Sequence, residues 1–205
     1  MSEQEKPAWL DQMLRSQSLG MKIGQCNIRP SLGLHFHGKL QKSILDTLSQ
    51  YQMLKRGEKV LVAYSGGPDS TALLHILKTL EKKLHIQVIA AHLNHGIRAA
   101  EADADARHCT EISRRLDIPI IVEKLDVPAY QKEHKLSMEM AARKVRYQFL
   151  KKTAHELTAQ KVALGHTADD QAEEILLNLI RGTGATGLAG INPVREFFFI
   201  RPLLF

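Results

Sequence analysis

Residues 60–71 read VLVAYSGGPDST, and this stretch decides the fold of the chain. The five apolar residues 60–64 are too few for a helix and predict a strand that is buried on both faces. The pair Gly66-Gly67 marks a tight turn, and Pro68 suits the first turn of a helix because it has no N–H to lose. The stretch therefore predicts a strand, a short loop and a helix in direct succession.

The loop 65–70 has the properties of a phosphate-binding loop, with the hydroxyl groups of Ser65 and Ser70 as additional donors. Its glycine N–H groups can approach a ligand closely, and the following helix points the positive end of its dipole at the same place. The carboxylate of Asp69 would repel phosphates unless Mg²⁺ bridged the two. A plain turn, in which Asp69 or Ser70 only caps the helix, is the alternative. The loop matches neither G-x-x-x-x-G-K-[ST] nor G-x-G-x-x-G.

Outward from this loop, short apolar runs alternate with amphipathic helical patterns. The alternation predicts an α/β fold in which a parallel sheet of about five strands carries helices on both faces. We expect strands at residues 60–64, 88–93, 119–122, 162–164 and 197–200. We expect helices at residues 40–54, 69–80, 101–116, 137–157 and 169–180. Such sheets bind ligands at the carboxyl ends of their strands, so the residues just after each strand are the candidates for function.

Residues 1–40 differ from the rest because glycines and prolines interrupt every long periodic pattern. We expect a poorly structured N-terminal extension over residues 1–40 and a single domain over residues 41–205.

Composition places the chain in a reducing compartment. The net charge of +6 suits a polyanionic partner, although a mildly basic enzyme would show the same excess. The two cysteines, Cys26 and Cys109, are too far apart for a C-x-x-C motif, which argues against a disulfide scaffold or a cysteine metal site. No stretch approaches the roughly 20 apolar residues of a membrane span. We therefore expect a cytoplasmic protein without membrane contacts.

Two pairs of charged residues are candidates for chemistry. Asp169 and Asp170 follow the fourth strand, where they could hold Mg²⁺ or accept a proton. Because one of them should cap the next helix, we assign capping to Asp169 and chemistry to Asp170. Arg143 and Arg146 share a helix face and could stabilise negative charge on a phosphate or contact a nucleic acid. A solvated helix face is the plainer interpretation of this second pair.

Further polar residues follow the second and fourth strands. His92, Asn94, His95 and Arg98 follow the second strand, and His166 follows the fourth. A hydrogen-bonded structural role is the alternative for His92 and for His166. Arg181 opens a glycine-rich segment, which predicts either a mobile phosphate-binding loop or a plain connector.

The string SGGPDS resembles the loop of the PP-loop ATP pyrophosphatases. Further segments sharpen this resemblance, namely HLNHGIR at 92–98, ARKVRYQFL at 142–150, GHTADDQAE at 165–173, RGTGATGL at 181–188 and IRPLL at 200–204. Together they make residues 59–204 similar to the N-terminal catalytic domain of the tRNA(Ile)-lysidine synthetases.

The resemblance implies a Rossmann-like PP-loop fold of the adenine nucleotide alpha hydrolase type, with ATP and Mg²⁺ as cofactors. It implies a ligase that adenylates the wobble cytidine in the CAU anticodon of tRNA(Ile), after which L-lysine displaces AMP. The residues expected at ATP are Ser65, Gly66, Gly67, Pro68, Asp69, Ser70, His92 and His166. Asp69, Asp170, Arg143 and Arg146 are the catalytic candidates, with Asp69 and Asp170 on the metal. Asn94, His95, Arg98 and Arg181 are expected at the tRNA or lysine.

Two other functions stay open. A tRNA thiolation enzyme also adenylates a base, but such enzymes usually need cysteines at the site, and Cys26 and Cys109 are poorly spaced for that. A non-catalytic nucleotide- or RNA-binding fragment is the other possibility, because the family continues past its R-P-L-L motif into a C-terminal tRNA-binding region that we expect this chain to lack. The sequence leaves a homodimer open.

Overall fold

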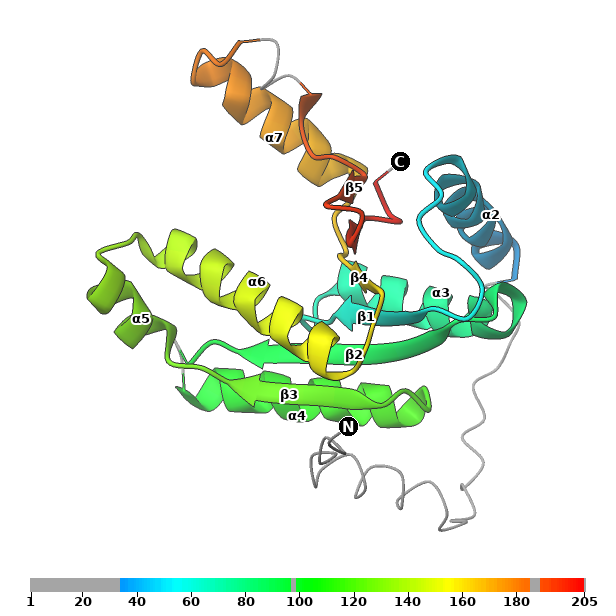
Figure 1. Cartoon of the computed structure of the whole chain (residues 1–205), viewed down its shortest axis with the longest axis horizontal. Coiled ribbons are helices and arrows are strands. Elements are labelled where there is room, and N and C mark those ends of the chain that lie inside the picture. Colours follow the sequence, from blue (N-terminus) through cyan, green and yellow to red (C-terminus); the bar gives the residue numbers. More distant parts are fainter. Residues whose placement is uncertain (1–33, 97–98, 185–188, 205) are drawn as a thin grey trace, which may run out of the picture. The chain divides into compact units, whose positions relative to one another are not determined.

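The computed structural model describes residues 34–96, 99–184 and 189–204 (Figure 1). The chain divides into two compact units, Met1–His37 and Gly38–Phe205. Of the first unit, only the start of helix α2 (Leu34–Gln50) is described. The expected N-terminal extension therefore lies largely outside the described residues, although α2 begins six residues before the helix that we expected at Leu40.

A six-stranded sheet organises the second unit, with the strand order β3-β2-β1-β4-β6-β5. Its strands are β1 (Lys59–Ala63), β2 (Gln87–Asn94), β3 (Ile120–Lys124), β4 (Lys161–Ala163), β5 (Val194–Arg195) and β6 (Phe199–Ile200). Every neighbouring pair runs parallel except β5 and β6, which are antiparallel. The expected parallel α/β sheet is thus confirmed, with one short antiparallel edge strand added.

Strand β1 lies at the centre of the sheet because it pairs with β2 on one side and with β4 on the other. Val60 and Val62 pack into the core on one face of the sheet, whereas Leu61 packs into the core on the opposite face. All three side chains are fully buried. A strand that is covered on both faces needs apolar residues at every position, and this is why its sequence shows no alternation.

Five helices cover the two faces of the sheet. Helices α2, α3 (Pro68–Leu84) and α4 (Ala99–Arg115) contribute to the core on one face. Helices α5 (Val127–His134) and α6 (Met138–Glu156) contribute to the core on the other. Helix α7 (Ala168–Ile180) has no buried side chain and extends away from the sheet in Figure 1. The expected helical cover on both faces is confirmed.

The structure departs from the expected elements in two places. Helix α5 was not expected, although Asp126 caps it by accepting a hydrogen bond from the N–H of Ala129 and Pro128 stands in its first turn. At the other end of the chain, the expected strand over 197–200 is shorter, because Phe197 adopts a positive φ of 51° in the turn between β5 and β6. None of the helices in residues 34–96, 99–184 and 189–204 has the combination of length and hydropathy that a membrane span requires.

Candidate active site

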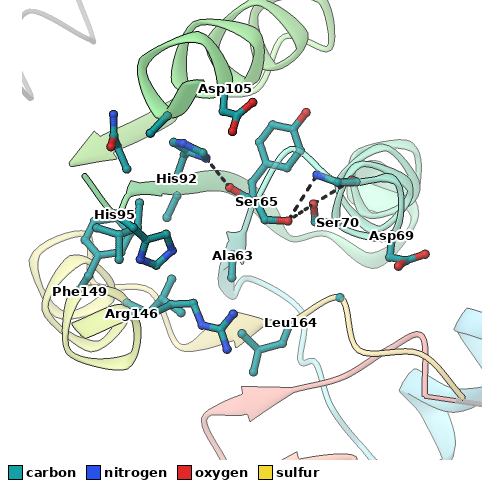
Figure 2. A pocket seen from close by; sticks show the side chains of 18 of the residues that line it. Ala63, Ser65, Asp69, Ser70, His92, His95, Asp105, Arg146, Phe149 and Leu164 are labelled. Atoms are coloured by element: carbon teal, nitrogen blue, oxygen red, sulfur yellow. Dashed lines mark hydrogen bonds between the residues drawn. The ribbon is translucent and has the colours of Figure 1, made fainter. Parts of the chain in front are cut away.

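A cavity of about 680 Å³ opens at the carboxyl ends of β1, β2 and β4, and this volume is typical of small-molecule sites (Figure 2). The cavity is lined by residues that follow β1 and β4, by the carboxyl end of β2, and by residues of α4 and α6. Ten residues predicted from the sequence line it: Ser65, Gly67, Asp69, Ser70, His92, Asn94, His95, Arg146, His166 and Asp170. These residues therefore meet at the carboxyl edge of the sheet, where parallel sheets bind their ligands.

The loop after β1 depends on Gly66. Its φ of +87° lies in the left-handed region that other residues rarely adopt. A Cβ at this position would also lie 2.9 Å from Sγ of Cys109, which is buried beneath the loop. Gly66 therefore allows the loop to pack directly on Cys109, and it does not itself line the cavity.

The N-terminus of α3 points at this cavity without a side-chain cap. Gly67 is the N-cap residue, it has extended backbone angles, and no side chain accepts a hydrogen bond from the first turn. Pro68 supplies no N–H, and the amides of Asp69 and Ser70 have no intrahelical acceptor. An anion at this point would meet these donors and the positive end of the helix dipole.

Hydroxyl groups hold the loop in this shape. Oγ of Ser70 donates to the carbonyl of Gly67 at 3.0 Å and lies 3.0 Å from Oγ of Ser65. Oγ1 of Thr71 donates to the same carbonyl at 2.8 Å. Ser70 is buried whereas Ser65 is exposed, so Ser65 is the hydroxyl that a ligand can reach.

The segment that follows β4 approaches the loop closely at Gly165. A Cβ on Gly165 would lie 3.2 Å from both the backbone N and Cα of Ser70. Only a residue without a side chain lets the chain leaving β4 pass the first turn of α3 at this distance. This approach brings His166 and Asp170 into the same cavity as the loop.

His166 presents one defined ring nitrogen to the cavity. Its Nδ1 accepts a hydrogen bond from Nε–H of Arg201 at 3.1 Å. Burial, followed by the positive charges of Arg201 and Arg146, lowers the pKa of His166 to about 4. His166 is therefore neutral at physiological pH, and because Nδ1 accepts, its proton is on Nε2, which is a hydrogen-bond donor.

His92 is anchored differently. Its side chain is buried, and Nδ1 lies 2.9 Å from the backbone carbonyl oxygen of Tyr64. A carbonyl oxygen accepts only, so Nδ1 carries a proton and Nε2 is the nitrogen left for other interactions. The structural role that we considered for His92 is thus present, and it coexists with a place in the cavity wall.

The expectation that Asp169 caps helix α7 was wrong. Helix α7 is capped by Thr167, and Asp170 is the acidic partner of a capping box. Oδ2 of Asp170 accepts a hydrogen bond from the N–H of Thr167 at 2.7 Å. Asp170, which lines the cavity, therefore uses one carboxylate oxygen for the cap, whereas Asp169 is exposed and takes no part in the cap.

The two arginines of α6 face different surroundings. Arg146 reaches into the cavity, as Figure 2 shows, and its Nε is buried without a hydrogen-bond partner in the described part of the chain. Burial lowers the pKa of Arg146, and the charge of Arg143 lowers it further. Burial and Arg146 also lower the pKa of His95. Arg143 is exposed and does not line this cavity.

Asn94 lies in the cavity wall, but its amide is already satisfied. It donates to Oδ1 of Asp103 at 2.7 Å and accepts from the N–H of Gly96 at 3.0 Å. Asp103 in turn pairs with Lys124 at 2.9 Å. Asn94 therefore fixes the end of β2 to α4. Of the other expected substrate contacts, Arg181 is exposed and outside the cavity, and Arg98 lies outside the described residues.

Four acidic residues line the cavity and are the candidate carboxylate ligands of a metal, namely Asp69, Glu101, Asp105 and Asp170. Among the described residues, no group of three or more His, Cys, Asp or Glu side chains is arranged to hold a metal ion. Mg²⁺ commonly binds through one or two carboxylates together with substrate phosphates and water. The exposed carboxylate of Asp69 at the rim, beside the first turn of α3, fits that second arrangement.

Sequence reasoning assigned no role to Arg201, Asp105 and Tyr64, which the structure places in or beside the site. Arg201 is buried and holds His166, while Tyr64 and Asp105 line the cavity. Arg201 belongs to the IRPLL segment at 200–204, but the sequence does not show that it contacts His166. Asp105 belongs to a helix pattern that sequence alone does not orient toward the loop.

Comparisons with known proteins agree with this architecture. A PP-loop domain family model matches residues 36–205. The tRNA(Ile)-lysidine synthase of Clostridium perfringens is 44% identical over 165 residues, which are 80% of this chain and 35% of that protein. The corresponding synthase of Dehalococcoides mccartyi is 43% identical over 155 residues, which are 76% of this chain and 33% of that one. The chain thus spans about a third of the length of these relatives.

The fold also occurs in a solved structure, the U34-tRNA thiolase NcsA from Methanococcus maripaludis with its [4Fe-4S] cluster. It superposes with a TM-score of 0.67 at 23% identity, over 82% of this chain and 59% of that one. This likeness concerns the fold alone. With the family model covering the whole sheet and every wall of the cavity, the chain belongs to the PP-loop domain family.

Proposed function

We propose that this chain carries the adenylation centre of a tRNA(Ile)-lysidine synthase. The observation that supports it most strongly is the match, at 44% identity over 80% of the chain, with a relative of that name. In this proposal, the 2-carbonyl oxygen of the wobble cytidine attacks the α-phosphate of ATP, and pyrophosphate leaves. The amine of L-lysine then attacks C2 of the base, AMP leaves, and a proton is lost from the nitrogen. We place the reaction in the cytoplasm.

The polyphosphate end of ATP belongs at the loop after β1. No side-chain cap competes for the amides of Asp69 and Ser70, and the exposed hydroxyl of Ser65 lies in the same loop. Bound there, Mg²⁺ would neutralise phosphate charge and make pyrophosphate a better leaving group. Asp69 is the carboxylate that would hold it.

Charge develops at the α-phosphate during the first step, and donors fixed in advance lower its energy. Arg146 reaches the cavity from α6, and His166, whose Nε2–H is the donor left by the bond to Arg201, lines it from the segment after β4. A neutral His166 donates without needing a proton from solvent, and this is the state that Arg201 and burial enforce. These two residues are our candidates for stabilising the transition state.

The second step requires a carboxylate near the lysine amine. A free lysine side chain is an ammonium ion at pH 7, with a pKa near 10.4, and it must lose a proton before it attacks. Asp170 lines the cavity and has one carboxylate oxygen beyond the one used in the cap. We therefore keep Asp170 as the group that orients the amine.

Thiolation is less well supported by the site. Cys109 is the one cysteine in the described ranges, and it lies buried beneath Gly66. Burial raises the pKa of its thiol to about 11, so almost none of it is thiolate at neutral pH. A sulfur-carrying nucleophile or a cluster ligand needs the opposite properties.

The test supplies the chain with ATP, Mg²⁺, labelled L-lysine and a tRNA(Ile) transcript with the CAU anticodon. We expect lysine to become attached to the RNA, with AMP and pyrophosphate released in equal amounts. A transcript in which uridine replaces the wobble cytidine is the matched control and should remain unlabelled. Transfer from a sulfur donor in place of lysine would favour the thiolation enzyme, and ATP binding without any transfer would favour a non-catalytic module.

A further inference from the structure

A second cavity, of about 500 Å³, lies where α5, α6 and the turn after β5 meet. We call it the basic hollow. It is lined by Tyr130, Met140, Arg143, Lys144, Tyr147, Gln148, Lys151, Arg195 and Glu196. No residue of the basic hollow lines the first cavity.

The charge of the basic hollow is unbalanced. It contains four cations and a single carboxylate, Glu196. Glu196 is already paired with Lys151 at 2.9 Å and with Arg195 at 3.2 Å, and the Lys151 ammonium holds its pKa below the usual range. Within the part of the chain that the structure describes, Arg143 and Lys144 have no carboxylate within ion-pair distance. The hollow therefore presents two uncompensated positive charges.

The positive charge converges on one aromatic ring. The guanidinium carbons of Arg143, Arg146 and Arg195 lie 5.8, 5.8 and 5.7 Å from the centroid of Tyr147. Each contact is favourable by itself, but three like charges around one ring repel one another. A polyanion bound over Arg143 and Arg195 would relieve that repulsion, and this is the chemistry that the hollow fits.

We infer that the basic hollow binds phosphates of the RNA strand that continues from the base undergoing adenylation. Arg146 and Tyr147 are adjacent in sequence, yet Arg146 lines the first cavity and Tyr147 lines the hollow. An RNA strand whose base enters the first cavity can thus place a neighbouring nucleotide in the hollow while it stays in contact with α6. An enzyme that acts on an extruded base typically grips the flanking nucleotides in this way.

A single-stranded RNA fits the hollow better than a free phosphate because of its aromatic walls. Tyr130 and Tyr147 both line it, and aromatic rings beside cations are the usual combination for unpaired nucleotides. Tyr130 is itself held by stacking on His134, with ring centroids 3.9 Å apart. The inference rests on the proposed function, since it supplies a place for the RNA of that reaction.

The test measures the affinity of the whole chain for a 17-nucleotide anticodon stem-loop carrying CAU, by fluorescence anisotropy across a salt series. The variant Arg143→Gln/Lys144→Gln removes the two uncompensated charges from the hollow. The matched control, Lys82→Gln/Lys83→Gln, removes two exposed charges from the last turn of α3, which packs on the opposite face of the sheet. Melting temperatures verify that each variant is folded.

We expect the hollow variant to bind the stem-loop roughly tenfold more weakly at physiological salt. Its log–log salt slope should fall by about 1.4, because two phosphate contacts are lost at about 0.7 per contact for a single strand. The control should keep the wild-type affinity and slope. Equal weakening in both variants, or none in the hollow variant, overturns the inference. Inorganic phosphate that competed as well as the stem-loop at equal phosphate concentration would also overturn it, in favour of a simple anion site.

A photocrosslink provides an independent readout. With 4-thiouridine beside the wobble position, we expect crosslinked peptides from α5, α6 or the turn at Glu196, whereas peptides from α7 alone would contradict the inference. Failure of the proposed function is recognised separately. In that case, the wild-type chain transfers no lysine to the full transcript even when the stem-loop is bound at the hollow.

Discussion

Nε–H of Arg201 donates a hydrogen bond to Nδ1 of His166 across 3.1 Å, joining residues that are 35 positions apart. Burial and, after it, the positive charge of Arg201 lower the pKa of His166 to about 4. We predict that the His166 ring remains neutral from pH 7 down to pH 5, with its proton on Nε2. Nitrogen-15 NMR of histidine-labelled protein, with His166→Gln to assign the signal, checks this. A midpoint near 6.5 would contradict it.

The same shift has a consequence for stability. The unfolded chain protonates His166 near pH 6.5 and the folded chain near pH 4, so the unfolded state binds more protons between these values. Stability from this residue is therefore fully present above pH 6.5 and is lost as the pH falls toward 4. Urea unfolding at pH 7 and pH 5 should show a smaller decrease for His166→Gln than for the wild-type chain. Equal decreases would count against the buried neutral imidazole.

Gly66→Ala should damage the loop more than Gly67→Ala. At position 66, an alanine would have to adopt the positive φ of 87° that Gly66 has, and its methyl group would lie 2.9 Å from Sγ of Cys109. We expect a loss of stability of about 1–2 kcal/mol for the backbone conformation alone, and weaker ATP binding. At Gly67, the φ of −72° is ordinary and the nearest atom is 3.5 Å away. Calorimetric titration with ATP and thermal melts of both variants make the comparison, and equal effects would refute this account of the loop.

Asp69→Asn should abolish pyrophosphate release while leaving the fold intact. The side chain is exposed, so the expected cost to stability is its interaction with the helix dipole, about 0.3–1 kcal/mol. Glu139→Gln removes an equivalent first-turn acid from α6, outside the cavity, and serves as the control. Pyrophosphate release is measured in increasing Mg²⁺. A variant that released pyrophosphate at the wild-type rate would show that this carboxylate does not hold the metal.

Thr167→Val and Asp170→Asn separate capping from chemistry at the start of α7. Both changes weaken the capping box, and each should lower stability by about 1 kcal/mol. Only Asp170→Asn also removes the carboxylate at the cavity, so we expect it to raise the KM for lysine at least tenfold more than Thr167→Val does. Lysine transfer measured over a range of lysine concentrations tests this. Matched kinetics in the two variants would leave Asp170 with a purely structural role.

The sequence predicted those parts of the site that are local. The strand, loop and helix over residues 60–71 follow from a short apolar run, two glycines and a proline, and all three occur. The preference of parallel sheets for ligands at the carboxyl ends of their strands also predicted that Ser65, His92 and His166 share one cavity. Patterns of this kind are encoded within a few residues of one another and depend little on the rest of the chain.

Features that depend on distant contacts were missed. Arg201 acquires its meaning only when β6 lies beside β4, which brings it to His166. Asp169 looked like the cap of α7, but Thr167 starts the helix two residues earlier and recruits Asp170. The antiparallel pairing of β5 with β6 depends on a turn at Glu196 and Phe197, where two non-glycine residues adopt positive φ. None of these three features produces a periodic pattern of apolar residues in the sequence from which it could be predicted.

In the proposed function, the amides at the start of α3 bind the polyphosphate of ATP. A crystal grown with α,β-methylene ATP and Mg²⁺ tests it most directly. The account predicts the β- and γ-phosphate oxygens within about 3 Å of the N–H groups of Asp69 and Ser70, with the metal between a phosphate and the Asp69 carboxylate. Nucleotide bound at full occupancy elsewhere in the molecule, with these amides facing solvent, would contradict it.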